Sequence, residues 1–343
     1  MQITPKTGRP QPPAADPSSP SAAPKPSPVR AFLQSRGNSA IADRTFGGLM
    51  LLCALSIFAI VVLILFELIS RSKLTIDKFG LGFFFGRAWD PVSGDFGALP
   101  FIYGTIVSSI VALIIAVPLA VGVAVFLTEM CPKVLRGPLA FLTELLAAIP
   151  SVVYGLWAVF ILVPLLRERV NPLLIKTLRW TGLFEPPNYG IGMLAAGVIL
   201  SIMILPIISS LTREVMSAVP HAQREAVLAL GATRWEMIRM GVLRNARIGI
   251  VGAIILGLGR ALGETMAVTM VIGNSPIISH SLLAPGYSMA SVIANEFNEA
   301  SDDLYRSALI EIGLALFIVT IIVNALARML VWAVTRGAPV RGS

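Results

Sequence analysis

Two ionisable residues stand inside an otherwise apolar stretch of the sequence. Arg260 and Glu264 lie four residues apart in the run GLGRALGETMAVTMVIGN, residues 257–274. On a single helix this spacing puts both side chains on one face. Each charge would cost about 2.5–3.5 kcal/mol near the centre of a bilayer, so we expect both to face the protein interior or a watery path. The pattern favours a functional pair over an internal salt bridge that only neutralises two charges.

A second candidate site is the polar stretch between Pro220 and Arg247, which carries too many charges to span a membrane. Its apolar residues recur at helical spacing on either side of Gly231. They are Ala222, Ala226 and Leu230 before the glycine, and Trp235, Ile238 and Val242 after it. Because glycine lets the backbone turn, we expect two short helices joined by a bend. Such a surface can dock a protein partner, although periodicity alone favours a helical connector lying on anionic membrane lipid.

The composition places these candidates in a membrane protein. Of the 343 residues, 55% are hydrophobic and only 13% are charged, and the mean hydropathy is +0.80. This is more apolar surface than a water-exposed globule could bury. The net charge of +8 raises the possibility of nucleic acid as a partner. Basic residues in a membrane protein usually mark cytoplasmic loops that face anionic lipid, so we expect no nucleic-acid partner.

Cysteine and histidine offer no site for chemistry. Cys53 lies in an apolar run and Cys131 precedes Pro132, without a histidine or second cysteine at metal-binding spacing. His221 and His280 are isolated in polar segments. We therefore expect no disulfide, no metal, no cofactor and no catalytic histidine.

Six apolar stretches are long enough to cross about 30 Å of hydrocarbon. They are residues 46–66, 101–127, 139–166, 191–211, 248–272 and 308–334, and four of the prolines, at which we expect kinks or breaks, are Pro118, Pro150, Pro164 and Pro206. Before them, residues 1–45 are rich in proline and serine and are predicted to be disordered. The organisation is then a first helix and outer loop over 46–95, a transmembrane domain over 96–336 that contains the 220–247 loop, and a short tail over 337–343.

The distribution of basic residues predicts the orientation. Of the 27 lysines and arginines, 17 lie on the side that holds both termini, nine lie on the other side, and Arg260 lies inside a helix. This bias puts both termini in the cytoplasm. The first outer loop carries aromatic runs, Phe83-Phe84-Phe85 and Trp89-Asp90-Pro91, which we expect to anchor at the membrane interface.

The 220–247 loop resembles a known element. Glu225 and Ala226, followed by Gly231 six positions after the glutamate, resemble the EAA loop of ABC importer permeases. Val227 stands where that pattern has a second alanine, and Gly241 where it has isoleucine. The resemblance implies that Glu225, Ala226 and Gly231 belong to a coupling helix that seats in a cleft of a cytoplasmic ATPase.

Three further runs resemble the PstC-type permeases of bacterial phosphate importers: residues 96–122, 147–160 and 257–274. The resemblance covers residues 46–336. It implies an all-α bundle of about six transmembrane helices with type I (MetI-like) ABC importer architecture, in the bacterial inner membrane. It also implies a PstA-like sister permease, an ATPase dimer and an external phosphate-binding protein as partners. The chain has no G-x-x-x-x-G-K-[ST] loop, so we expect a non-catalytic subunit whose partner hydrolyses ATP.

On this resemblance Arg260 would donate charge-assisted hydrogen bonds to the oxygens of inorganic phosphate. Glu264 would hold Arg260 by pairing and exchange that pairing as the gate moves. Three alternatives remain: an ABC permease for another oxyanion or small nutrient, a membrane scaffold that reports phosphate supply, and a secondary transporter. The last is disfavoured because no two similar halves with matching broken helices are evident.

Overall fold

The structure is a computed structural model that describes residues 39–335. The predicted C-terminal tail and most of the predicted N-terminal tail lie outside these residues. Helix α2 (Ser39–Arg71) begins inside the tail that we predicted for residues 1–45. The chain divides into a unit that ends at Val62 and a unit that begins at Leu63. In the first unit every described side chain from Asp43 to Val62 is exposed, so this apolar part of α2 has the surface of a lipid-facing or partner-facing helix.

The second unit begins with the end of α2 and a small outer cap before the long helices. The cap comprises α3 (Lys73–Phe79), α4 (Gly82–Phe85), and strands β1 (Trp89–Asp90) and β2 (Asp95–Phe96), which pair antiparallel. The next segments are α5 (Leu99–Val125), the π-helical turn η1 (Phe126–Met130) and α6 (Lys133–Ala148). A helix then runs through α7 (Ser151–Trp157), η2 (Ala158–Leu162), α8 (Val163–Leu165), η3 (Leu166–Val170), α9 (Asn171–Leu178) and η4 (Arg179–Thr181).

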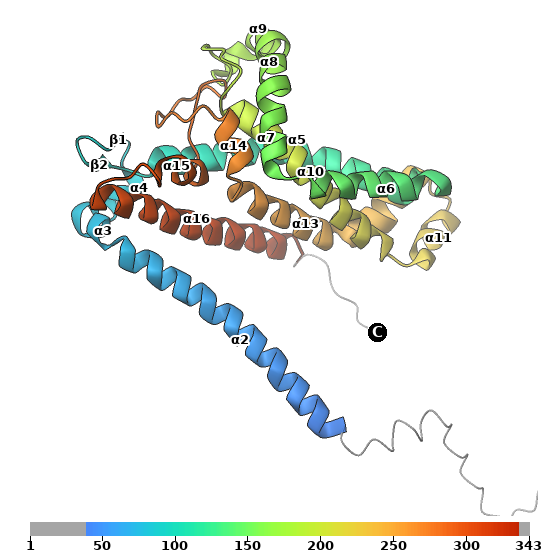
Figure 1. Ribbon diagram of the computed structural model, residues 1–343. Helices are drawn as coiled ribbons and strands as arrows, with labels where there is room; N and C mark the ends of the chain where they lie inside the picture. Colours follow the sequence, from blue (N-terminus) through green and yellow to red (C-terminus); the bar gives the residue numbers. More distant parts are fainter. Residues whose placement is uncertain (1–38, 336–343) are drawn as a thin grey trace, which may run out of the picture. The chain divides into compact units, whose positions relative to one another are not determined.

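The remaining elements carry both candidate sites. They are α10 (Met193–Ser217), α11 (His221–Ala229), α12 (Arg234–Glu236), η5 (Met237–Leu243), α13 (Arg244–Leu262), α14 (Met266–Val271), α15 (Met289–Glu296) and α16 (Asp303–Thr335). In Figure 1, α5, α10, α13 and α16 lie side by side, and α7 to α9 leave this layer at a steep angle.

Six helices of the described chain are long and apolar enough to cross a membrane, which confirms the predicted number. They are Asp43–Arg71, Leu99–Met130, Ser151–Thr181, Met193–Ser217, Arg234–Leu262 and Asp303–Met329. The third was predicted to begin at Leu139, which is wrong because the backbone is extended at Ile149 and Pro150 (ψ 129° and 140°) and separates α6 from α7. The expected break at Pro150 is therefore present, whereas α5 and α10 continue through Pro118 and Pro206.

The main core lies between α5 and α10. Four alanines one turn apart on α5 are fully buried: Ala112, Ala116, Ala120 and Ala124. Gly197 on α10 lies against Val111, where an added Cβ would come within 2.4 Å of the valine side chain. Small residues at one-turn spacing let two helix backbones approach closely, which is how helices associate without a hydrophobic driving force in lipid.

The outer cap corrects one expectation. The aromatic runs of the first outer loop do not all serve as membrane anchors, because Phe83 is fully buried and Trp89 packs on Phe96 and Phe101 with ring centroids 4.9 and 4.8 Å apart. The Trp89 indole N–H donates to Glu296 over 2.8 Å. A half-buried indole N–H is stabilised by such a partner, and the carboxylate on α15 supplies it within the protein. Of the phenylalanine triplet, Phe85 is the ring that remains exposed.

Candidate functional sites on the coupling loop and the fifth spanning helix

The predicted bend of the 220–247 loop is present. Helix α11 starts after Pro220 and ends at Ala229, and Gly231 then adopts φ +85°, a left-handed conformation that favours glycine. The second half differs from the prediction, because it is not a separate short helix. Thr233 and Glu236 form a capping box at the start of α12, and the chain continues helically through η5 into α13. The loop therefore consists of one separate short helix, α11, and the start of the fifth spanning helix.

One face of this loop is open to a partner. Glu225 and Ala226 are exposed, and Leu230 and Trp235 keep 88% and 62% of their surface accessible. Next to Trp235 lies a groove of about 540 Å³. It is lined by Glu129, Met130, Leu228, Arg234, Trp235, Met237 and Ile238. Exposed aliphatic and aromatic side chains beside a groove are typical of a protein-interaction surface.

The residues where the loop departs from the EAA pattern pack against each other. Gly241 on η5 lies against α11, where an added Cβ would meet Val227 at 3.4 Å. The Asn245 side-chain amide donates to Gln223 over 2.8 Å on the same side. Ile238 and Val242, which we placed on the apolar face of the second helix, are 4% and 0% exposed in a cluster at the base of the loop. An added Cβ at Gly241 would therefore only reach van der Waals contact with Val227, so this packing does not require a glycine.

Arg224 is a residue that the sequence reasoning missed. Its Nε and Nη2 donate to Glu129 Oε1 over 3.2 and 3.0 Å, and Nη2 also donates to the Met216 carbonyl over 2.9 Å. Its Nη1 donates to the Val219 carbonyl. The exposed fractions of the two side chains are 11% for Arg224 and 8% for Glu129. The partners are 95 residues apart, so no local pattern could have identified the pair.

The intramembrane pair is arranged differently from the prediction. Helix α13 ends at Leu262, and Gly263, Glu264 and Thr265 leave the helix before α14 begins. The expectation that Arg260 and Glu264 share one helical face is therefore wrong, and no ion pair joins them in the described chain. Gly263 has a low helix propensity, and the Thr265 hydroxyl donates to the Gly263 carbonyl over 3.3 Å, which competes with the helical bonding.

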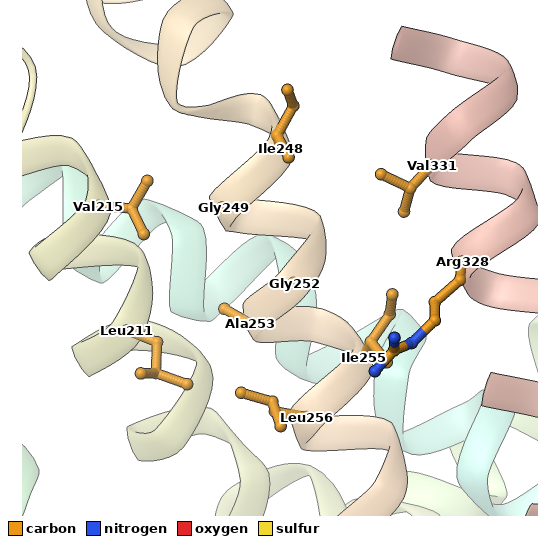
Figure 2. Close-up of a pocket in the computed structure, with 10 residues that line it drawn as sticks. All are labelled: Leu211, Val215, Ile248, Gly249, Gly252, Ala253, Ile255, Leu256, Arg328 and Val331. Carbon is orange, nitrogen blue, oxygen red and sulfur yellow. The ribbon is translucent and has the colours of Figure 1, made fainter. Parts of the chain in front are cut away.

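Arg260 lies on an uncovered face of α13. Ile248, Gly252 and Leu256 precede it on the same side of the helix, and Arg260 itself is exposed. A groove of about 530 Å³ lies between α10, α13 and α16, and its lining includes Ile248, Gly252 and Leu256 together with Arg328 of α16, but not Arg260 (Figure 2). No atom comes within 4 Å of a Cβ built on Gly252 or Gly259. Because an intramembrane cation cannot face lipid without a large cost, this face must be covered by another helix or line a hydrated path.

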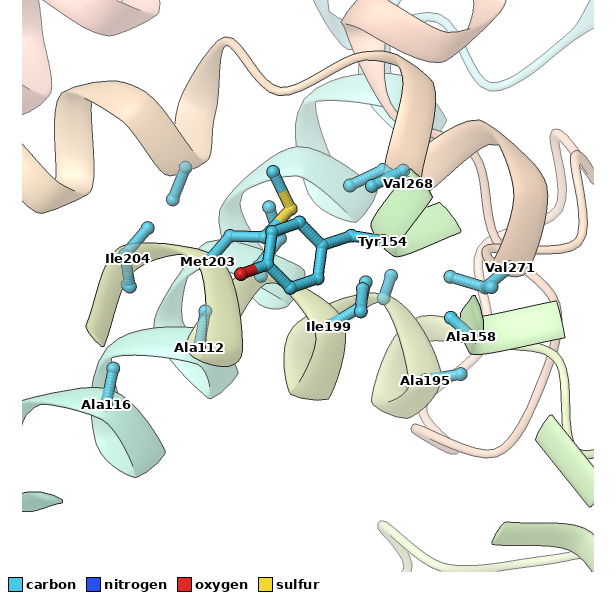
Figure 3. Packing of buried hydrophobic residues seen from close by; sticks show 14 of the residues in the cluster. Ala112, Ala116, Tyr154, Ala158, Ala195, Ile199, Met203, Ile204, Val268 and Val271 are labelled. Atoms are coloured by element: carbon cyan, nitrogen blue, oxygen red, sulfur yellow. The ribbon is translucent and has the colours of Figure 1, made fainter. Parts of the chain in front are cut away.

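The break after α13 lies near the break after α6. Helices α7 and α14 pack together, and Gly155 on α7 lies against Met270 and Ala267 of α14. The Tyr154 hydroxyl donates to the Leu146 carbonyl across the first break over 2.7 Å. Figure 3 shows Tyr154 beside Met203 and Val268 in the main core. The structure thus brings two helix discontinuities and one unpaired arginine into the same region.

The comparisons with known proteins agree with this arrangement. Residues 116–336 match the family described as "Binding-protein-dependent transport system inner membrane component". The chain is 46% identical over 279 residues to "Phosphate transport system permease protein PstC" of Mesorhizobium japonicum, covering 79% of this chain and 85% of that protein. It is 45% identical over 284 residues to the PstC of Haemophilus influenzae, covering 82% and 90%.

A solved structure supports the fold. A bacterial ABC transporter involved in the import of the acidic polysaccharide alginate aligns with a TM-score of 0.58 at 16% identity, over 87% of this chain and 99% of that one. At this identity the likeness concerns the fold alone. The sequence matches, six spanning helices and permease fold agree, and the chain belongs to the PstC-type permeases within the binding-protein-dependent inner membrane transport components.

Proposed function

We propose that this chain is the permease subunit of an ATP-driven importer of inorganic phosphate and forms half of the translocation pathway beside a PstA-like sister permease. The observation that carries the proposal is Arg260, a cation on an open face of a spanning helix without an ion-pair partner among the described residues. A guanidinium can donate to two phosphate oxygens at once. The names of the PstC relatives support phosphate as the anion.

Glu264 regulates this site in our proposal. It follows Gly263 outside the helix, so its position depends on the backbone between α13 and α14. An ionised carboxylate repels phosphate, whereas it can pair with Arg260 when the anion has left. Exchange between the two partners would keep phosphate binding weak enough for release. The absence of a fixed Arg260–Glu264 pair in this conformation leaves the guanidinium free to receive the anion.

The coupling loop receives the ATPase dimer. Glu225, Ala226 and the bend at Gly231 present α11 to the partner, and Trp235 with its groove extends the same surface. The loop between α10 and α12 lies on the cytoplasmic side if the basic residues face inward, which places both termini in the cytoplasm and the outer cap toward an external phosphate-binding protein. The proposed location of the importer complex is the bacterial inner membrane.

The test is ATP-dependent uptake of inorganic phosphate into vesicles that contain this chain with its sister permease and ATPase. Arg260→Gln should reduce uptake at least tenfold while the subunits still co-purify. The control Arg71→Gln removes a cation from an exposed ion pair with Glu67 and should leave uptake unchanged. Normal uptake by a well-assembled Arg260→Gln complex would overturn the role of Arg260. Stronger competition by sulfate or molybdate than by phosphate would replace the proposed substrate with another oxyanion.

A further inference from the structure

We propose that the Arg224–Glu129 pair is the link through which the coupling helix α11 moves α5 and α10, so that both are positioning residues for transport. The proposal rests on the proposed function in one respect, namely that an ATPase docks on α11. The link itself is defined by contacts within this chain. One guanidinium joins three segments: α11, which carries Arg224, η1 at the end of α5, which carries Glu129, and the end of α10 with the residues that follow it, which present the Met216 and Val219 carbonyls.

The carbonyl contacts connect Arg224 to the end of α10. A cation near the last carbonyls of a helix is favoured by the helix dipole. Arg224 donates to the Met216 carbonyl in the last turn of α10, which also accepts from the Val219 N–H, and to the Val219 carbonyl just beyond the helix, while its fork holds Glu129. A lysine could not reach these acceptors together, because it offers a single ammonium in place of a planar fork. The arginine therefore connects α11 to both α5 and α10 through side-chain hydrogen bonds.

Helix α11 also packs against η5 at the start of the fifth span. No residue of α11 is fully buried, but Val227 packs on the cluster that holds Ile238 and Val242, and Gln223 accepts a hydrogen bond from Asn245. Beyond α11 the chain passes Gly231, which is exposed and has no atom within 4 Å of a built Cβ. A movement of α11 is therefore passed to the fifth span by side-chain packing on η5, and to α5 and α10 by the charge-assisted hydrogen bonds of Arg224.

The experiment compares transport with ATP hydrolysis in the full importer complex in nanodiscs or vesicles. Glu129→Gln keeps the shape of the side chain, and Arg224→Lys keeps the charge but not the fork. For both variants we expect at least a fivefold lower amount of inorganic phosphate moved per ATP hydrolysed, with ATPase activity retained. The matched control is Arg213→Lys, whose partner Glu144 lies 2.6 Å away and is 57% exposed, and its ratio should equal that of the unmodified chain.

A distance measurement separates this role from a merely structural one. Spin labels at Ala222 on α11 and Leu119 on α5, introduced after Cys53→Ser and Cys131→Ala, report whether the helices move together. We expect one distance population with and without ATP, and a broadened distribution on ATP addition in the Glu129→Gln chain. An unchanged transport ratio together with an unchanged distribution in that chain would overturn the proposal. If the unmodified complex moves no phosphate, the proposed function fails, whereas the distance measurement still decides whether the link exists.

Discussion

Two arginine–glutamate pairs lie at different depths of this protein and behave in opposite ways. Arg260 and Glu264 are four residues apart, yet a helix end separates them and they form no ion pair in the described chain. Arg224 and Glu129 are 95 residues apart, yet they are nearly buried and share two hydrogen bonds. Proximity in sequence therefore did not produce the pairing, and the pairing that exists joins distant elements.

The comparison shows that Arg224 is held by several hydrogen bonds, whereas Arg260 is exposed and accessible. In the 220–247 loop a nearly buried charge is bonded to one carboxylate and two carbonyls, so the local geometry is held. At the end of α13 the cation is exposed and the backbone leaves the helix, so the guanidinium remains available to a ligand or a partner. On the proposed function, the first site would transmit movement and the second would bind and release the anion.

Removing one partner of the buried pair should give the largest change in stability. Glu129→Ala leaves the nearly buried Arg224 charge without its carboxylate, and we expect the free energy of unfolding to fall by about 3 kcal/mol. Glu67→Ala, which breaks the exposed pair with Arg71, should lower it by no more than about 0.5 kcal/mol. Thermal unfolding of the purified chain in detergent measures both. Equal losses of stability for Glu129→Ala and Glu67→Ala would show that the Arg224–Glu129 pair does not stabilise the fold more than an exposed pair does.

Substitutions on the two faces of α13 should change the free energy of unfolding by smaller amounts than Glu129→Ala does. Gly257 packs against the buried Ile208, where a Cβ would come within 2.7 Å, so Gly257→Ala should cost about 1–3 kcal/mol. Gly252 meets open space, and Gly252→Ala should be neutral or stabilising by up to about 1 kcal/mol in the isolated chain. Unfolding in detergent checks the pair of variants. A reduced yield of complex with the sister permease for Gly252→Ala alone would place that partner on the open face.

The smallest effect should be the coupling between Arg260 and Glu264. A double-mutant cycle with Arg260→Gln and Glu264→Gln should give an interaction energy within about 0.5 kcal/mol, because no bond joins the residues. The corresponding cycle with Arg224→Gln and Glu129→Gln should exceed about 1.5 kcal/mol. Both cycles use the same unfolding measurement. A large value for the first cycle would mean that the two intramembrane charges pair in the conformation that dominates in detergent.

Several features of the fold follow from local rules. Length and hydropathy are sufficient to count spanning helices, and the number six is confirmed. The turn at Gly231 was also predictable, since glycine adopts φ +85° at little cost. The fifth span was predicted to continue to Ile272, and this is wrong because hydropathy does not register a helix end within an apolar run. The standing of Arg260 and Glu264 as pathway residues remains a prediction.

The sequence by itself determined that this chain crosses a membrane, how often it does so, and that a polar loop with a bend at Gly231 joins the fourth and fifth spans. These properties depend on composition and on contacts within a few residues. Only the tertiary structure decided that Trp89 is part of a buried cluster, that Glu264 lies beyond the helix of Arg260, and that Arg224 bonds Glu129. Each of these depends on which distant segment supplies the neighbour, and that is set by how the helices pack.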